Sequence, residues 1–222
     1  MDLKLLLLLA AGHFTTDINT GALPAFLPFI KEPLQLSYTM TASIILVFNV
    51  TSSVIQPFFG YLSDRWSMKW LLPAGPFIAS LGLALLGFGP SYSWIVFFAA
   101  LSGLGQASYH PEGFKTVNYI SGEKKATAIS LFHFGGNLGF ALGPIMATLF
   151  FRHFGLKGSL LFFIPGMIML LIFIFLPQWQ VKTHQLAIKK RASSTNARPN
   201  TYAMVLLLFT VVFRSAARLG LL

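Results

Sequence analysis

The chain has 222 residues, of which 55% are hydrophobic and only 10% carry a charge. A soluble domain usually has about 25% charged residues, so this composition excludes a lone soluble globule and favours a membrane protein. Lys and Arg outnumber Asp and Glu by 16 to 6, and the absence of cysteine excludes disulfides and thiolate metal sites. At about 20 apolar residues for each spanning helix, the length allows six or seven spans.

Apolar stretches cut by charges, Pro and Gly predict six spanning helices along the chain. The first runs over residues 5–30 and the second over 39–62. The third and fourth share an uncharged stretch that begins at Trp70, turns at residues 89–91 and continues to Ile120. The fifth and sixth run over 126–151 and 159–176, with loops at 121–125 and 152–158. Residues 1–176 are therefore expected to form a polytopic, all-α helix bundle.

The remainder of the chain is expected to add a linker and an unfinished span. Residues 177–200 are polar and basic, which is typical of a cytoplasmic linker, and a seventh apolar stretch begins at 201 and reaches Leu222. The N-terminal stretch has some features of a cleaved signal peptide. Its apolar character resumes after Asp17 and continues to Ile30, which favours a retained first span.

The distribution of basic residues predicts the orientation. With the N-terminus in the cytoplasm, most of the 16 Lys and Arg fall on the cytoplasmic side, and only Lys31, Arg152 and Lys157 fall outside. Cytoplasmic loops of membrane proteins carry such an excess. We therefore expect a multi-pass protein of the inner (plasma) membrane whose partner is the lipid bilayer. The basic charge needs no nucleic acid to explain it.

The connection between the second and third spans carries a specific pattern. It resembles the G-x-x-x-D-R-x-x-x-K loop of the major facilitator superfamily, where this loop acts as a conformational latch. The matching residues are Gly60, Asp64, Arg65 and Lys69. Ser67 and Met68 replace the usual Gly and Arg in its middle, so the outer part of the pattern is degenerate.

The fifth span carries a second pattern. Gly139 and Gly143 are four residues apart and give one flat helix face for close packing, and Pro144 removes a backbone hydrogen bond and bends the helix. This resembles the antiporter motif G-x-x-x-G-P of the same superfamily, which implies that these three residues form a helix hinge.

Three further segments resemble the fosmidomycin-resistance type of efflux permease within that superfamily. They are His13 with Asp17, then residues 110–112, then residues 132–137. The resemblance implies the N-terminal six-helix half of a major-facilitator fold, with two inverted three-helix repeats. It also implies that a missing C-terminal half or a homodimer mate completes the cavity.

Ionisable residues inside a membrane are costly and mark proton or substrate pathways. Asp17 lies about 18 Å along the helix from Leu5, near mid-bilayer, and shares a helix face with His13. The resemblance gathers Asp17, Glu112, Arg214 and Arg218 around one cavity. The expected proton-coupling and cavity residues are Asp17, His13, His110, Glu112, Arg214, Arg218 and Asn137.

Structural alternatives exist for several of these residues. Asp17 and His13 could form a purely structural polar pair, and Glu112 could simply pair with Lys115. Arg214 and Arg218 could flank a span that begins later, and His110 and His133 could be satisfied core histidines. The histidines show no paired ligand spacing, so no metal site is expected.

These features predict a transporter and not an enzyme, with no cofactor. The chain has no P-loop, dinucleotide fingerprint or nucleophile elbow. The expected function is secondary active transport by alternating access, with protons and a small drug-like or anionic compound as substrates, as in antibiotic efflux by an antiporter. An ion-coupled importer of the same fold is one alternative. A non-transporting truncated fragment or interaction subunit is another, and the ending inside a span favours it.

Overall fold

A computed structural model of the chain describes residues 1–66, 68–176, 202, 205–206 and 209–210. The chain divides into two compact units, Met1–Leu186 and Ala187–Leu222. In the second unit the described residues are helical, and the Thr210 hydroxyl donates a hydrogen bond to the carbonyl of Leu206. The predicted linker at 177–200 and both arginines of the predicted seventh span lie outside the described residues.

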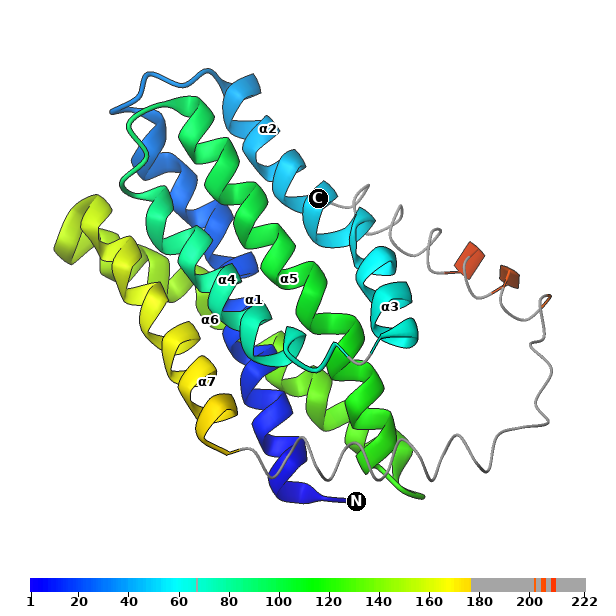
Figure 1. Ribbon diagram of the computed structural model, residues 1–222. Coiled ribbons are helices and arrows are strands. Elements are labelled where there is room, and N and C mark those ends of the chain that lie inside the picture. Colours follow the sequence, from blue (N-terminus) through cyan, green and yellow to red (C-terminus); the bar gives the residue numbers. More distant parts are fainter. Residues whose placement is uncertain (67, 177–201, 203–204, 207–208, 211–222) are drawn as a thin grey trace. The chain divides into compact units, whose positions relative to one another are not determined.

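The described part of the first unit is built from helices and turns, with no strand. Its elements are α1 (Leu3–Lys31), α2 (Tyr38–Asn49), the π-helical η1 (Val50–Val54), α3 (Gln56–Arg65), α4 (Leu71–Leu86), α5 (Tyr92–Ile120), α6 (Lys125–Phe154), the 3₁₀-helical η2 (Gly155–Phe162) and α7 (Phe163–Phe175). Figure 1 shows these helices running up and down one bundle, with α3 continuing the line of α2. The predicted turns at 89–91 and 121–125 separate α4 from α5 and α5 from α6.

The starts of α1 and α2 follow local capping chemistry. The Asp2 carboxylate accepts the Leu5 backbone N–H at 3.2 Å, and the Ser37 hydroxyl oxygen accepts that of Met40 at 3.1 Å. Such caps satisfy backbone donors that have no partner in the first helical turn. The backbone N–H of Asp2 also donates to the carbonyl of Ile120 at 3.2 Å, so the N-terminus lies beside the turn between α5 and α6.

Two predicted boundaries differ from the structure. The second span, predicted over 39–62, runs from Tyr38 to Arg65 and contains a π-helical turn. This turn lies next to Pro57, which has no backbone N–H, so one carbonyl of the preceding turn lacks its usual partner. The predicted loop at 152–158 is wrong, because α6 reaches Phe154 and a 3₁₀ helix leads directly into α7. Gly155 makes that bend with φ of 58°, a conformation that favours glycine.

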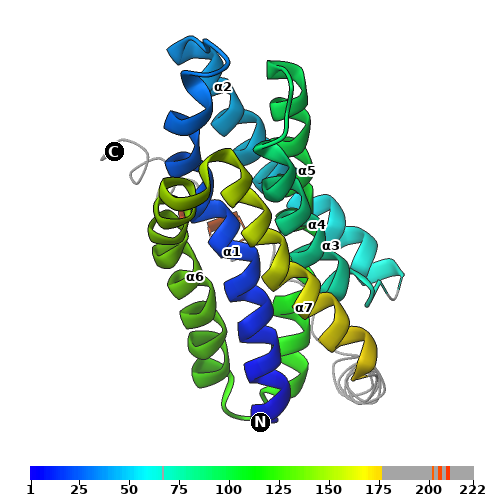
Figure 2. The same ribbon diagram turned by 90° about the vertical axis from the view of Figure 1, so that its left-hand side faces the viewer.

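Membrane crossing is supported by length and composition for part of the bundle. Two described helical stretches are long and apolar enough to cross a bilayer, Tyr38–Arg65 and Lys125–Phe175. The second includes both α6 and α7, which Figure 2 shows as separate rods joined by a bend. Leu71–Leu86 is a shorter apolar helix. The number of six crossings stays a prediction.

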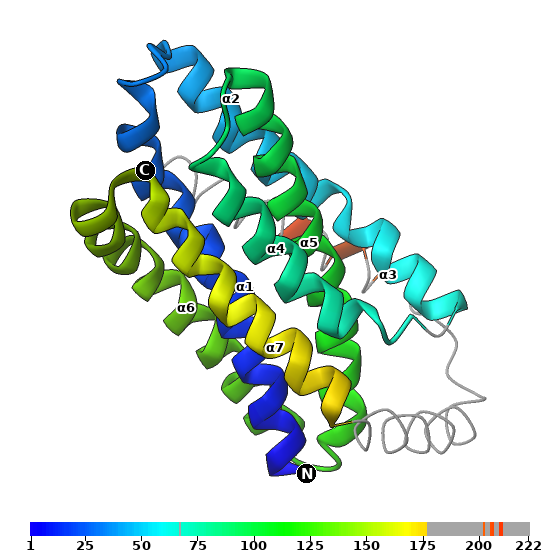
Figure 3. The same ribbon diagram turned by 60° about the vertical axis from the view of Figure 1, so that its left-hand side comes forward.

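The packing order agrees with two interlocked repeats. α1 packs most extensively along α6, and α5 packs along α4 and also along α2, η1 and α3. The first span of each predicted repeat thus lies against the second span of the other. α7 packs along α4 and touches α1, as Figure 3 shows with α7 in front of α1.

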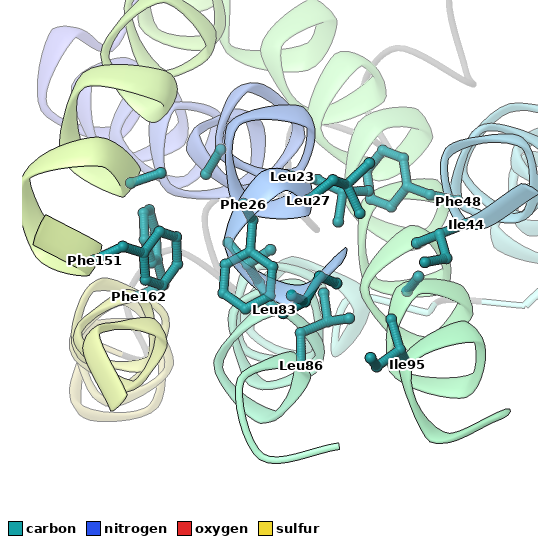
Figure 4. Packing of buried hydrophobic residues seen from close by; sticks show 14 of the residues in the cluster. Leu23, Phe26, Leu27, Ile44, Phe48, Leu83, Leu86, Ile95, Phe151 and Phe162 are labelled. Carbon is teal, nitrogen blue, oxygen red and sulfur yellow. The ribbon is translucent and has the colours of Figure 1, made fainter. Parts of the chain in front are cut away.

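The apolar core is divided into two clusters along α1. One contains Phe26 with its ring 4.4 Å from that of Phe151, together with Phe48, Leu83 and Ile95 from other helices (Figure 4). The other gathers Leu5, Leu6 and Leu9 of α1 with residues of α5, α6 and α7. Between Leu9 and Ile18, α1 turns several polar side chains inward, and these form the candidate site.

Candidate functional site

The centre of the candidate site is the carboxylate of Asp17. Its Oδ2 lies 3.2 Å from Nε2 of His13, and its Oδ1 lies 3.1 Å from Nε2 of His110. Gln106 donates its side-chain N–H to the same Oδ1 at 3.0 Å. α1 and α5 therefore meet through one carboxylate that contacts two imidazoles and an amide, and its side chain is only 18% exposed.

The outer ring nitrogens of both histidines have fixed partners. Nδ1 of His13 lies 2.9 Å from the carbonyl of Phe132, and Nδ1 of His110 lies 2.9 Å from the carbonyl of Gln106. A carbonyl only accepts hydrogen bonds, so each Nδ1 must carry a hydrogen. Each Nε2 then faces the Asp17 carboxylate, and a hydrogen bond there requires one further hydrogen.

Aromatic rings enclose the imidazoles. The His13 ring lies 4.1 Å from that of Phe132 and 4.9 Å from that of His110. Tyr109 is fully buried beside them and donates its hydroxyl to the carbonyl of Leu9 at 2.6 Å. These contacts restrict rotation of His13, which is itself buried.

Two contributors to the site were missed by the sequence analysis. Gln106 lies four residues before His110 and so shares its helix face. A polar amide at this position of an apolar helix was a signal that could have identified it. Gly136 of α6 forms a wall, because a Cβ there would lie 2.5 Å from Nε2 of His13 and 2.7 Å from Oδ2 of Asp17. No local pattern of the sequence relates Gly136 to α1.

The structure does not place any of the other predicted cavity residues against this carboxylate. Asn137 is exposed, one position beyond Gly136 on α6. His133 is exposed as well, with its ring 6.0 Å from that of His13 and 4.9 Å from that of Phe114. Arg214 and Arg218 fall outside the described residues.

Glu112 belongs to a second polar set, between α3 and α5. Its buried carboxylate accepts a hydrogen bond from the Ser63 hydroxyl and lies 3.5 Å from the Lys115 ammonium. The Lys115 Nζ also lies 3.4 Å from the Asp64 carboxylate and donates to the Ser63 hydroxyl oxygen at 2.8 Å. The pairing with Lys115 that the sequence left open is thus what the structure shows.

The other residues of the loop motif have contacts of their own. The Arg65 guanidinium lies 4.7 Å from the centre of the Tyr61 ring. Partial burial lowers the pKa of Lys69, and the negative charge of Glu112 opposes that shift. A Cβ added at Gly60 would lie 3.6 Å from Cβ of Pro111, an ordinary contact, so close packing does not require glycine here.

The glycines of α6 do allow close packing against α1. Added Cβ atoms at Gly139 and Gly143 would approach backbone atoms of α1 closer than 3.0 Å, and Gly135 behaves in the same way. The flat face predicted for this helix is therefore used. Pro144 lies inside α6, which continues ten residues beyond it to Phe154.

Comparison with known proteins gives the family. Residues 9–221 match the Major Facilitator Superfamily. The chain belongs to that superfamily. It is 28% identical to the fosmidomycin resistance protein of Escherichia coli (strain K12) over 217 residues. This alignment covers 94% of this chain and 53% of that protein.

Two further relatives agree with this membership. An uncharacterised transporter of the superfamily from Bacillus subtilis (strain 168), YfnC, is 29% identical over 175 residues, covering 79% of this chain and 43% of the relative. The multidrug resistance protein MdtG of Rahnella sp. (strain Y9602) is 29% identical over 170 residues, covering 73% of this chain and 40% of that protein. The chain thus spans about half the length of the curated relatives that it matches. The predicted family and its fosmidomycin-resistance type are confirmed.

Proposed function

We propose that the chain provides the first half of a proton-coupled secondary transporter that exports a small drug-like or anionic compound by alternating access. The single observation that carries this proposal is the Asp17 carboxylate, which contacts His13 and His110 halfway along α1. Membership of a transporter superfamily supports transport, and the names of its resistance-conferring relatives support export.

The geometry supports proton coupling through the number of hydrogens that the site needs. The two contacts between imidazole nitrogens and the carboxylate require two hydrogens. With neutral rings and an ionised carboxylate the three groups carry one negative charge, and with both hydrogens they carry one positive charge. A buried charge is costly, so each proton that enters or leaves changes the free energy of the surrounding helices. Asp17, His13 and His110 are the proposed proton carriers, positioned by Gln106.

The second polar set has a different role in the proposal. Lys115 joins the loop residue Asp64 to the buried Glu112 and to Ser63, and so ties the end of α3 to α5. We assign these residues to the cytoplasmic latch, with Gly60, Arg65 and Lys69 of the loop motif. Glu112 is therefore left out of the proton path.

The proposed setting is the inner membrane, with the N-terminus in the cytoplasm. Arg214 and Arg218 would balance Asp17 or attract an anionic substrate, and Asn137 would face the cavity. A C-terminal half or a second copy of the chain would complete that cavity. Import of a compound with an ion by the same fold is the second candidate.

Transport in vesicles distinguishes export from import. The protein is reconstituted with its second half, and fosmidomycin is the first probe because a relative is named for resistance to it. A pH gradient imposed in each direction should drive the drug opposite to the protons. Movement of the drug in the same direction as the protons would favour the importer. Drug movement at the same rate with and without the pH gradient would contradict proton coupling.

A further inference from the structure

We infer that His13, Asp17 and His110 form a binding site for a divalent transition-metal ion of the zinc class. Each of the three residues offers one ligand atom, and these atoms lie within 4.8 Å of one another. The inference concerns binding by the chain itself. It therefore goes beyond the proposed transport and does not depend on it.

The histidines have the orientation that metal ligands need. Their Nδ1 atoms face the backbone carbonyls of Phe132 and Gln106, so in the neutral ring each Nε2 presents a lone pair to the site. A histidine that binds a metal normally donates its other ring N–H to such a carbonyl or to a carboxylate, which fixes the ring. Both histidines meet this condition, and both Nε2 atoms point to one carboxylate.

The distances fit a small ion. Zinc binds histidine nitrogen and carboxylate oxygen at about 2.0–2.2 Å in tetrahedral geometry, which places neighbouring ligand atoms roughly 3.3–3.6 Å apart. The two distances from imidazole nitrogen to carboxylate oxygen are 3.2 and 3.1 Å. An ion would enter by a slight opening of these two contacts and by adjustment of the two ring nitrogens, since the three ligand atoms lie within 4.8 Å of one another. It would replace the hydrogens that otherwise occupy the contacts.

An unpartnered buried oxygen supplies a second, independent observation. Gln106 is 7% exposed, its N–H donates to Asp17, and its Oε1 has no hydrogen-bond partner among the described residues. Rotation of this amide by a half-turn brings Oε1 to the side of the carboxylate, where it faces the ion. The described chain then offers two nitrogens and two oxygens, the number of ligands that a tetrahedral site takes.

The donor types and the charge select the class of ion. Two imidazoles favour zinc, cobalt or nickel over magnesium and calcium, which prefer oxygen ligands. Neutral rings with an ionised Asp17 carry one negative charge, which suits a divalent cation. Among the described residues, the other titratable groups near the site are Tyr109, whose hydroxyl donates to Leu9, and His133, whose ring lies 6.0 Å from that of His13.

The test is direct binding by the purified full chain in detergent, without a polyhistidine tag. Titration with Zn²⁺ should show one tight site per chain. Co²⁺ should give the intense visible absorption of tetrahedral coordination, and Zn²⁺ should remove that absorption. His13→Gln and His110→Gln should each weaken Zn²⁺ binding at least tenfold.

His153→Gln is the matched control. His153 also lies on a helix, and its Nδ1 contacts the carbonyl four residues earlier, as that of His110 does, yet it is exposed and outside the site. Binding should be unchanged in this variant. Equal weakening by His153→Gln would overturn the inference, because it would indicate surface histidines only.

The unaltered chain also tests the inference, whatever happens to the folding of the variants. If its Co²⁺ spectrum stays that of the hydrated ion, the site does not exist. Such a result would leave the vesicle experiment on proton coupling untouched, so the two proposals can fail separately.

Discussion

At the scale of residues, the account depends on how one carboxylate is surrounded. Asp17 contacts His13 from its own helix and His110 and Gln106 from α5. Its partners are fixed in turn, because carbonyl oxygens accept from the outer nitrogen of each ring and Gly136 packs closely beside Nε2 of His13. A gain or loss of hydrogen here therefore changes the charge of a rigid group of side chains.

Gln106→Leu tests the importance of this fixed arrangement. The substitution keeps the approximate volume and removes the N–H that donates to Asp17. A hydrogen bond to a charged group contributes about 1.5–3 kcal/mol. Initial rates of proton-driven efflux by equal amounts of protein should therefore fall about tenfold or more. A rate equal to that of the unaltered protein would show that Gln106 does not position the carboxylate.

At the scale of elements, α5 is the helix that joins the two polar sets. Its residues 106–110 contact α1, and Glu112 and Lys115, about one turn further, contact α3. Because both sets lie on one helix, a movement of α5 that alters the Asp17 contacts also acts on the latch loop. This arrangement connects the centre of the bundle with its predicted cytoplasmic end.

Lys115→Met tests the connection between α3 and α5. The change leaves the buried Glu112 carboxylate without its cation, and removal of one partner from a buried pair is destabilising. The melting temperature in detergent should fall, and Glu112→Gln combined with Lys115→Met should recover part of the loss. Lys125→Met, at an exposed lysine where α6 begins, should leave the melting temperature unchanged. If Lys115→Met has the same melting temperature as the unaltered protein, the proposed connection between α3 and α5 is contradicted.

Local signals account for most of the helices and for part of the site. Gly and Pro at residues 89–91 mark a true turn, and the spacing of His13 and Asp17 places both on one face of α1. The π-helical turn lies next to Pro57, a local signal that the sequence analysis did not use, whereas the continuation of α6 through Arg152 has no such signal. His110 was among the expected proton-coupling residues, but its contact with Asp17 arises only because α5 packs against α1 and could not be read from the sequence. Gln106 could have been found from its position one turn before His110.

At the scale of the whole molecule, the account depends on membership of the superfamily and on the orientation of the bundle. The chain matches the superfamily over residues 9–221 and spans about half the length of its curated relatives. In the described part of the chain, the N-terminus and the turn between α5 and α6 lie at one end of the bundle, as the contact of Asp2 with Ile120 shows. The predicted orientation places this end in the cytoplasm.

Cysteine labelling tests that orientation without background, because the chain has no cysteine of its own. Glu123→Cys introduces a thiol in the exposed turn between α5 and α6, and Lys157→Cys introduces one at the exposed bend before α7. A membrane-impermeant maleimide should label Lys157→Cys from outside the inner membrane and Glu123→Cys only after permeabilisation. The reverse pattern would overturn the predicted topology.

The most direct measurement is proton-driven efflux by Asp17→Asn in the full-length transporter, with expression and melting temperature measured in parallel. The variant keeps the shape of the side chain and removes the group that can ionise between His13 and His110. Glu123→Gln, at an exposed carboxylate away from the site, is the matched control. The account predicts that Asp17→Asn folds normally and loses efflux driven by a pH gradient, whereas Glu123→Gln retains it. Efflux by Asp17→Asn at the rate of the unaltered protein would contradict the central claim.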